Sequence, residues 1–236
     1  MDSFGSGEAW PRPAGTVLEG IVGSIAYGLA TDSSDTDRLG VFLVGTRKLL
    51  GLSWSSSKES RTFRKPDGAY HELGKFCRLA LAANPTVLEL LFLDSYMLIT
   101  PIGAELVSLR DRFVSKRVRA TYGGYARGEL TRLLRAEGVS SEKVASARRK
   151  KGRHIRRLVL QLESLLSSGV IQVRLDDAQR EECFSFGDLA ERNPAELDAW
   201  LSSELTRLDA LDSGLPDAPD FDAVERFLVA TRLGAI

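Results

Sequence analysis

Gly23-Ser24-Ile25-Ala26-Tyr27-Gly28, followed by Ser34-Asp35-Thr36-Asp37, is the stretch of the sequence that decides the fold. The first run comes directly after the β-leaning residues 16–22, which predict a strand that ends in a tight turn. The second run opens the apolar segment 35–44, which we expect to be a neighbouring strand. On a strand, side chains two positions apart point to the same face, so the pattern predicts two carboxylates, Asp35 and Asp37, beside a glycine turn.

This pairing of a turn with carboxylates points to phosphate chemistry. Residues two apart on a strand have Cα atoms about 6–7 Å apart, so Asp35 and Asp37 can converge on Mg²⁺, or on Mn²⁺ in its place. Gly23 permits a tight turn close to a phosphate, and Ser24 adds a hydroxyl donor at the start of a short helix, where backbone N–H groups attract anions. An exposed strand end would suit both aspartates equally well, so the spacing alone leaves the metal site open.

The rest of the chain divides into an alternating part and a helical part. Strands and helices alternate through the first hundred residues, with a weak strand expected over 61–69 and an amphipathic helix over 70–81. Five helices are expected after Pro101, over 104–113, 120–137, 142–168, from 193 to about 208 and over 221–233. We therefore expect a flexible leader at 1–15, a catalytic domain at 16–101 and a helical domain at 102–236.

The composition is that of an ordinary soluble globular protein. Of the 236 residues, 43% are hydrophobic and 27% are charged, and the 32 basic side chains balance the 32 acidic ones. No apolar stretch approaches the roughly 20 residues of a membrane helix, so we expect a cytoplasmic protein with no membrane partner. The two cysteines, Cys77 and Cys183, are expected to be buried reduced thiols rather than a disulfide.

The motifs together resemble the DNA polymerase β superfamily of nucleotidyltransferases, and within it the predicted-nucleotidyltransferase branch of bacteria and phages. The resemblance rests on the two runs quoted first, on Gly40-Val41-Phe42, on residues 67–76 and 84–92, and on the helix around 151–160. It implies an α+β fold, in which a small mixed nucleotidyltransferase sheet with flanking helices is followed by an α-helical C-terminal domain. It also implies a nucleoside triphosphate (NTP) substrate.

The resemblance further implies a third carboxylate that binds metal and helps to deprotonate the attacking hydroxyl. Asp67 is the candidate, because it precedes a helix as the family's acidic residue does, although Pro66 and Gly68 disturb the segment as a strand. Glu72 is the alternative. It would otherwise be a solvated residue in the first turn of a helix, where a negative charge is favoured.

A basic block at 148–157 supplies candidates for binding the triphosphate. Lys151, His154 and Arg157 are spaced by three residues along one edge of the expected helix, and Lys75 on an earlier helix is a further candidate. These side chains could contact triphosphate oxygens or a nucleic-acid backbone. A solvated basic face is the competing interpretation of the whole block.

The sequence therefore predicts a Mg²⁺-dependent nucleotidyltransferase that moves a nucleoside monophosphate from an NTP, for example ATP, to an acceptor hydroxyl. RNA, tRNA or another nucleic acid, DNA included, is the favoured acceptor because the basic block suits a polyanion. A protein hydroxyl, as in the AMPylating relatives of toxin–antitoxin type, is the main alternative, and a small molecule is less favoured. A catalytically inactive nucleic-acid-binding module is the competing hypothesis from another class.

Overall fold

A mixed five-stranded sheet forms the base of the molecule in the computed structural model, which describes residues 12–32, 34–52, 54–55, 58–64, 67–135 and 142–235. The strand order is β3-β4-β2-β1-β5, with β2 and β4 parallel and the other neighbours antiparallel. The strands are β1 (Thr16–Val22), β2 (Asp37–Phe42), β3 (Ser60–Arg64), β4 (Asp67–Glu72) and β5 (Leu98–Ile99). This sheet and the helices that follow it confirm the predicted fold class. Residues 1–11 of the predicted leader lie outside the described residues.

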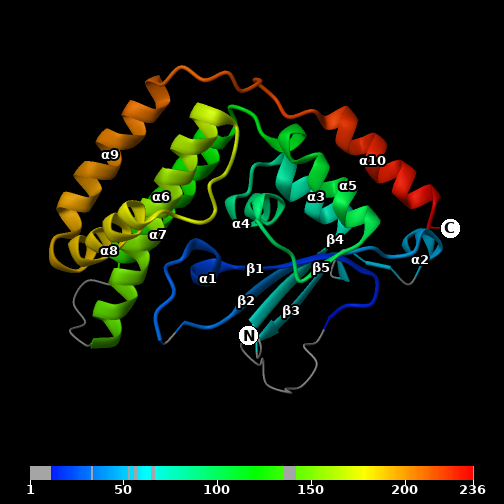
Figure 1. Ribbon diagram of the computed structural model, residues 1–236, viewed down its shortest axis with the longest axis horizontal. Coiled ribbons are helices and arrows are strands. Elements are labelled where there is room, and N and C mark those ends of the chain that lie inside the picture. Colours follow the sequence, from blue (N-terminus) through cyan, green and yellow to red (C-terminus); the bar gives the residue numbers. More distant parts are fainter. Residues whose placement is uncertain are drawn as a thin grey trace.

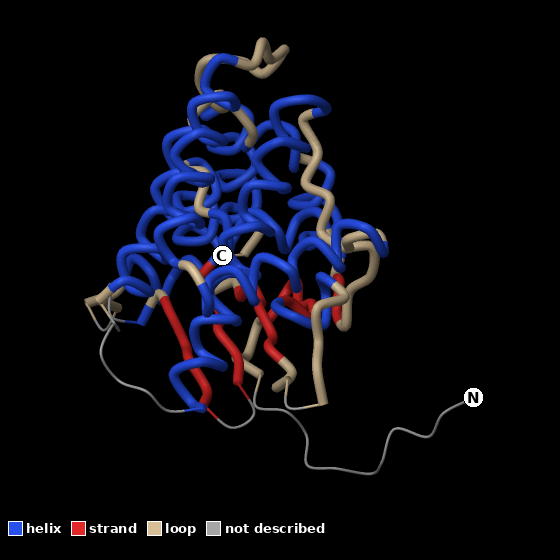
Figure 2. The backbone as a smooth tube through the Cα atoms, turned by 90° about the vertical axis from the view of Figure 1, so that its left-hand side faces the viewer, coloured by secondary structure: helices blue, strands red, loops and turns tan. Residues whose placement is uncertain are grey.

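Most helices lie on one side of the strands, as Figure 2 shows. The helices that precede the helical half are α1 (Gly23–Tyr27), α2 (Thr46–Leu50), α3 (Leu73–Leu81), α4 (Pro85–Leu88), η2 (Glu89–Phe92), α5 (Pro101–Ser108) and η3 (Arg110–Phe113). The helices of that half are α6 (Val118–Leu134), α7 (Glu142–Ser168), α8 (Asp177–Arg192), α9 (Pro194–Ala210) and α10 (Phe221–Leu233). Among the described residues, no helix is long and apolar enough to cross a membrane.

The helical periodicity located several boundaries well. The described bounds of α7 are the predicted ones, and Gly169 follows it in the left-handed conformation (φ 74°) that ends many helices. The predicted start of α9 is also confirmed, because the side chain of Asn193 accepts a hydrogen bond from the backbone N–H of Glu196 and Pro194 occupies the first turn.

Three local expectations were wrong. The weak strand expected over 61–69 is the end of one strand and the beginning of the next, because β3 and β4 form an antiparallel pair. Residues 70–72 belong to β4, not to the helix expected over 70–81. Their alternating burial shows the period of a strand, and the carboxylate of Glu72 accepts a hydrogen bond from the N–H of Gly74 to cap α3. Asp35 lies in the loop before β2, so it shares no strand face with Asp37.

A buried ion pair lies inside the sheet layer. Glu19 on β1 is fully buried, and Arg38 on the adjacent strand β2 donates to its Oε1 at 2.9 Å. Arg12 pairs with the other carboxylate oxygen. Arg38 therefore stabilises the sheet layer, since removing one partner would leave a charge buried in the protein.

One hydrophobic core runs from the sheet into the helical half, joining for example Leu18, Phe76, Tyr122 and Leu162. Because this core is continuous, the division into domains 16–101 and 102–236 stays a prediction. Both cysteines are buried and free, as expected.

The last helix returns to the sheet. As Figure 1 shows, α10 lies beside α3, far from the other helices of the C-terminal half. Arg232 forms an ion pair with Glu72 at 2.8 Å, and the backbone N–H of Thr46 donates to the carbonyl of Ala235. The C-terminal end of the described chain is therefore fixed to the sheet.

Candidate functional site

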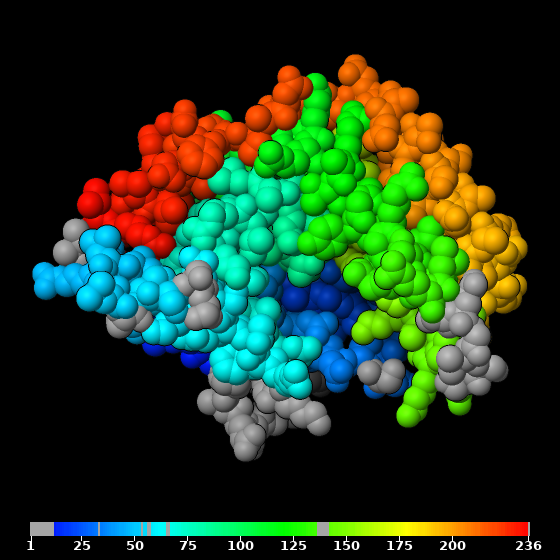
Figure 3. Space-filling view, turned by 180° about the vertical axis from the view of Figure 1, so that it is seen from behind, coloured from blue at the N-terminus to red at the C-terminus, as the bar shows by residue number. Residues whose placement is uncertain are grey.

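A cavity of about 490 Å³ lies between one end of the sheet and the N-terminal half of α7. Figure 3 shows the hollow, with early residues of the chain (blue) at its bottom and later segments (cyan to green) around it. The polar residues that line it come from distant parts of the chain: Gly23, Ser24, Thr31, Ser34, Asp35, Asp37, Arg38, Asp67, Thr86, Glu89, Ser146, Lys150, Arg153, His154 and Arg157. The fold therefore gathers most of the predicted site residues around one space.

The glycine turn is built against the aspartates. Gly23 begins α1 with φ at 72°, a conformation that side chains disfavour. A Cβ atom at Gly23 would lie 2.3 Å from Oδ2 of Asp37, which is far too close. Both the backbone conformation and the lack of space for a side chain therefore require glycine at position 23. The turn can then lie directly against the Asp37 carboxylate.

Asp37 and Asp67 begin neighbouring strands. β2 and β4 run parallel, and Arg38 pairs with Gly68, so the residues before them start the two strands side by side. Asp35 lines the same cavity from the preceding loop. The pKa of Asp37 is raised, first by burial and then by the negative charges of Asp67 and Asp35, while Lys150 opposes the shift. Asp35 and Asp67 are thus both close enough to repel the Asp37 carboxylate.

These carboxylates fit a hard divalent cation. In the part of the chain that the structure describes, no three acidic, histidine or cysteine side chains form a complete metal site. Mg²⁺ commonly binds through one or two carboxylates and completes its shell with water and substrate phosphates. Asp35, Asp37 and Asp67 supply oxygen donors of that kind, and the repulsion at Asp37 would be relieved by a cation. The donor set therefore suits a metal that arrives with a nucleotide.

Some basic side chains of α7 form ion pairs outside the cavity, and others line the cavity. Three cations are neutralised by acidic partners outside the cavity: Arg149 by Glu191, Lys151 by Glu129 and Arg156 by Glu182. Lys150 and Arg153 instead line the cavity, on the same helical face as His154 and Arg157. The cavity wall opposite the aspartates is therefore positively charged.

The structure places the predicted residues as follows. Gly23, Ser24, Asp35, Asp37, Asp67, His154 and Arg157 come together around the cavity, whereas Lys75 and Lys151 are not among its lining residues. Glu72, the alternative to Asp67, is the last residue of β4, about 16 Å along the strand from Asp67, and pairs with Arg232. Lys150 and Arg153 were missed as individual candidates. The signal for them was their helical spacing of three or four residues from His154 and Arg157.

A buried polar network forms the floor of the cavity. Tyr27 donates its hydroxyl to Oε2 of Glu89 at 2.5 Å, and Nη1 of Arg157 donates to the same oxygen at 3.3 Å. The guanidinium of Arg157 also stacks on the Tyr27 ring, 4.0 Å from its centroid, and donates to Gln161 at 2.8 Å. Burial raises the pKa of Glu89, and Arg157 opposes this. The sequence signal for Glu89 was a single acid within the apolar run 87–93, and it was missed.

His154 contributes a neutral ring. Nη2 of Arg157 lies 3.0 Å from Nδ1 of His154, and because arginine can only donate, Nδ1 must accept and Nε2 carries the proton. Burial, followed by the positive charge of Arg157, lowers the pKa of His154 to about 3. At neutral pH His154 is therefore an N–H donor and not a cation.

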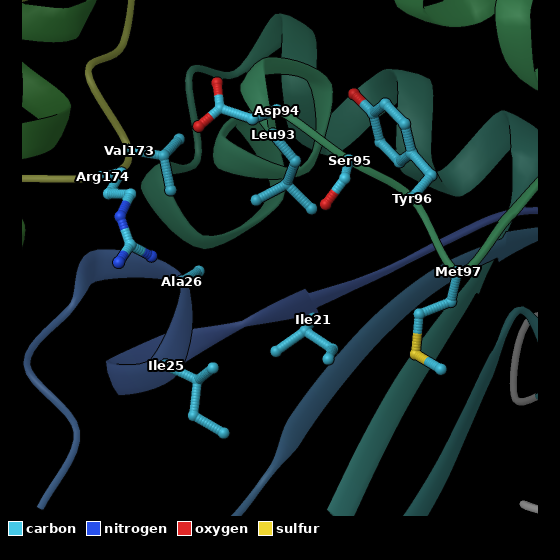
Figure 4. Close-up of a pocket in the computed structure, with 10 residues that line it drawn as sticks. All are labelled: Ile21, Ile25, Ala26, Leu93, Asp94, Ser95, Tyr96, Met97, Val173 and Arg174. Carbon is cyan, nitrogen blue, oxygen red and sulfur yellow. The ribbon is translucent and has the colours of Figure 1, made fainter. Parts of the chain in front are cut away.

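A second, smaller cavity of about 240 Å³ lies on the other side of β1 and α1. Figure 4 shows its mainly apolar lining, with Ile21 and Ile25 below, Leu93 above and the charged side chains of Asp94 and Arg174 at one end. It contains none of the predicted site residues. Neighbouring residues of one strand and one short helix thus face two different cavities.

The comparisons with known proteins agree with this geometry. A family model described as "RNA repair pathway DNA polymerase beta family" matches residues 9–181, which is well over half of the chain. The matched range contains all five strands and every residue that lines the larger cavity. No curated protein is similar enough to the chain to give a match.

Proposed function

Because the chain belongs to the RNA repair pathway DNA polymerase beta family, we propose that it is a Mg²⁺-dependent nucleotidyltransferase that uses an NTP to modify a hydroxyl of RNA. The observation that carries this proposal is that three carboxylates, a glycine turn and the basic side chains of α7 line one cavity. Phosphoryl-group chemistry depends on that combination, because its catalysis consists mainly of positioning and charge stabilisation.

The residues divide the work by charge. Gly23 and Ser24 would hold the triphosphate at the N-terminal end of α1, and Lys150 and Arg153 would contact its oxygens from the facing wall. Asp35, Asp37 and Asp67 would hold Mg²⁺, which when bound neutralises the charge that develops on the phosphates. Lys75 and Lys151 have no role in this assignment because neither lines the cavity.

The transfer needs one general base, which takes the proton of the attacking hydroxyl. The acceptor hydroxyl oxygen would attack the α-phosphorus while the bond from that phosphorus to the bridging oxygen of the β-phosphate breaks, so that pyrophosphate leaves. Asp67 is the carboxylate proposed to take the hydroxyl proton, since it is exposed at the start of β4 whereas Asp37 is half-buried against the turn. His154 cannot act as a cation in this step, because its ring is neutral.

The test is incubation of the protein with each labelled NTP, Mg²⁺ and total RNA, followed by separation of labelled RNA from labelled protein. We expect label in RNA, and we expect Asp37→Asn to abolish it while leaving the folded state intact. Asp209→Asn is the matched control, since Asp209 is exposed on α9 and does not line the cavity. Equal labelling by wild type and Asp37→Asn would refute the proposal.

The same experiment separates the alternatives. Label in protein instead of RNA would favour an AMPylating transferase. RNA binding without transfer, unaffected by Asp37→Asn and lost when Lys150 and Arg153 are both replaced by alanine, would favour an inactive binding module.

A further inference from the structure

Glu89 is an unusual group to find in the wall of a nucleotide site. Its side chain is almost completely buried, yet it lines the cavity that we assign to a negatively charged substrate. A buried carboxylate is costly unless it is paired and hydrogen-bonded, and Arg157 and Tyr27 provide both. The network therefore keeps a charged acceptor in place at the floor of the cavity.

Both of these contacts use the same oxygen. Tyr27 and Arg157 donate to Oε2, and no described residue donates a hydrogen bond to Oε1. A carboxylate oxygen can accept two hydrogen bonds, so this capacity of Oε1 is unused in a residue that lines the cavity. Oε1 is therefore held in a fixed position and is free to accept a hydrogen bond from a ligand.

The charge of the network excludes the phosphates as that partner. Glu89 already forms an ion pair with Arg157, while Lys150 and Arg153 line the same cavity and form no ion pair with another described residue. The phosphates therefore belong with Gly23, Lys150 and Arg153. What remains for Glu89 is the uncharged part of the nucleotide, where the donors are sugar hydroxyls and base amino groups.

We propose that Glu89 is a specificity-determining residue whose Oε1 accepts a hydrogen bond from the nucleoside of the bound NTP. The inference rests on the proposed function, because it assumes that the cavity holds an NTP. Tyr27 and Arg157 are positioning residues in this assignment. They fix the carboxylate by the 2.5 Å and 3.3 Å hydrogen bonds, and the stacking of Arg157 on Tyr27 holds α7 against α1.

The test compares the preferred NTP with three analogues that each lack one donor: the 2′-deoxy form, the 3′-deoxy form and the form without the exocyclic amino group. Both kcat/KM for transfer and the Kd from calorimetry with Mg²⁺ and no acceptor are measured. A hydrogen bond to a charged group predicts that wild type binds one analogue roughly 10- to 100-fold more weakly than the parent NTP. The identity of that analogue distinguishes a sugar hydroxyl from a base amino group.

Glu89→Gln replaces the free acceptor with a donor at constant shape, so it should bind the parent NTP and that analogue equally. Glu105→Gln is the matched control, because Glu105 is exposed on α5 and lies outside this cavity; it should discriminate as wild type does. If Glu89→Gln does not fold, Glu89→Asp keeps the charge beside Arg157 and withdraws the oxygen, and should also lose the discrimination.

Unchanged discrimination in a folded Glu89 variant would overturn this inference, as would a wild type that binds all three analogues like the parent. Neither result affects the proposed function, which fails only if Asp37→Asn retains transfer. A Glu89 variant that discriminates normally and only requires more Mg²⁺ would identify Glu89 as a metal ligand and would also overturn the inference.

Discussion

Replacing Gly23 with alanine tests whether activity requires the close contact between the glycine turn and the Asp37 carboxylate. The left-handed conformation of Gly23, with φ at 72°, costs a residue with a side chain about 1–2 kcal/mol. The added Cβ would also lie 2.3 Å from Oδ2 of Asp37, so the carboxylate has to move. Since a misplacement of about 1 Å can cost roughly 100-fold in rate, we expect Gly23→Ala to reduce transfer by about that factor.

Gly169→Ala is the control, because it carries the same backbone cost without the clash. Gly169 has φ at 74° after the end of α7, and a Cβ there would meet only Leu215, at 3.6 Å. Urea denaturation should show a loss of about 1–2 kcal/mol in the free energy of unfolding for Gly169→Ala, and at least that loss for Gly23→Ala, which also has the clash. Labelled-NTP transfer should fall only for Gly23→Ala. Full transfer by a folded Gly23→Ala variant would refute the contact between turn and carboxylate as a requirement for activity.

Three further changes have clear expected outcomes. Lys150→Ala should raise KM for the NTP about 10-fold through a lost phosphate contact, whereas Lys151→Ala should change it less than about twofold, because Lys151 already pairs with Glu129 at 2.9 Å; steady-state kinetics decides. Arg38→Met should lower the free energy of unfolding in urea by about 3 kcal/mol because it leaves Glu19 buried with one partner fewer, and a loss below about 1 kcal/mol would contradict this. At pH values between the ordinary pKa of 6.5 and the folded pKa of about 3, His154 binds more protons in the unfolded state, so the protein loses stability as the pH is lowered through this window. His154→Gln should reduce the loss between pH 6.5 and 5 by about 1.6 kcal/mol, measured by urea denaturation at each pH.

The sequence predicted the long helices better than the short segments between secondary-structure elements. Long periodic segments such as α7 and α10 were located correctly because a helical stripe must face the core over many turns. Residues 70–72 were misread because Tyr70, Leu73 and Phe76 fit helical spacing, while the strand period of Tyr70 and Glu72 extends over too few residues to compete. Residues 70–72 are a strand because β4 pairs with β2 and β3. The spacing of apolar residues within one segment does not predict its pairing with distant strands.

The candidate site shows the same division. Asp37 and Asp67 could be named from local motifs, but their closeness depends on the parallel pairing of β2 and β4. The basic block was recognised as a block, but which of its members face the cavity depends on acids far away in the chain, such as Glu129 and Glu191. Glu89 was not recognised as a site residue because it lies in an apolar run. Nothing near it in the sequence indicates Arg157, whose ion pair with Glu89 makes the burial of this carboxylate tolerable.

The return of α10 to the sheet restricts how the cavity can open. The helical half leaves the sheet layer at Pro101, and its far end is fixed to that layer by Arg232 and Ala235. A segment attached at both ends cannot swing about a single hinge. Any movement of α7 away from the sheet would therefore have to bend the chain between these two anchors. A chain cut within 211–220 would remove the covalent link to the second anchor, and every residue that lines the cavity precedes that cut in the sequence.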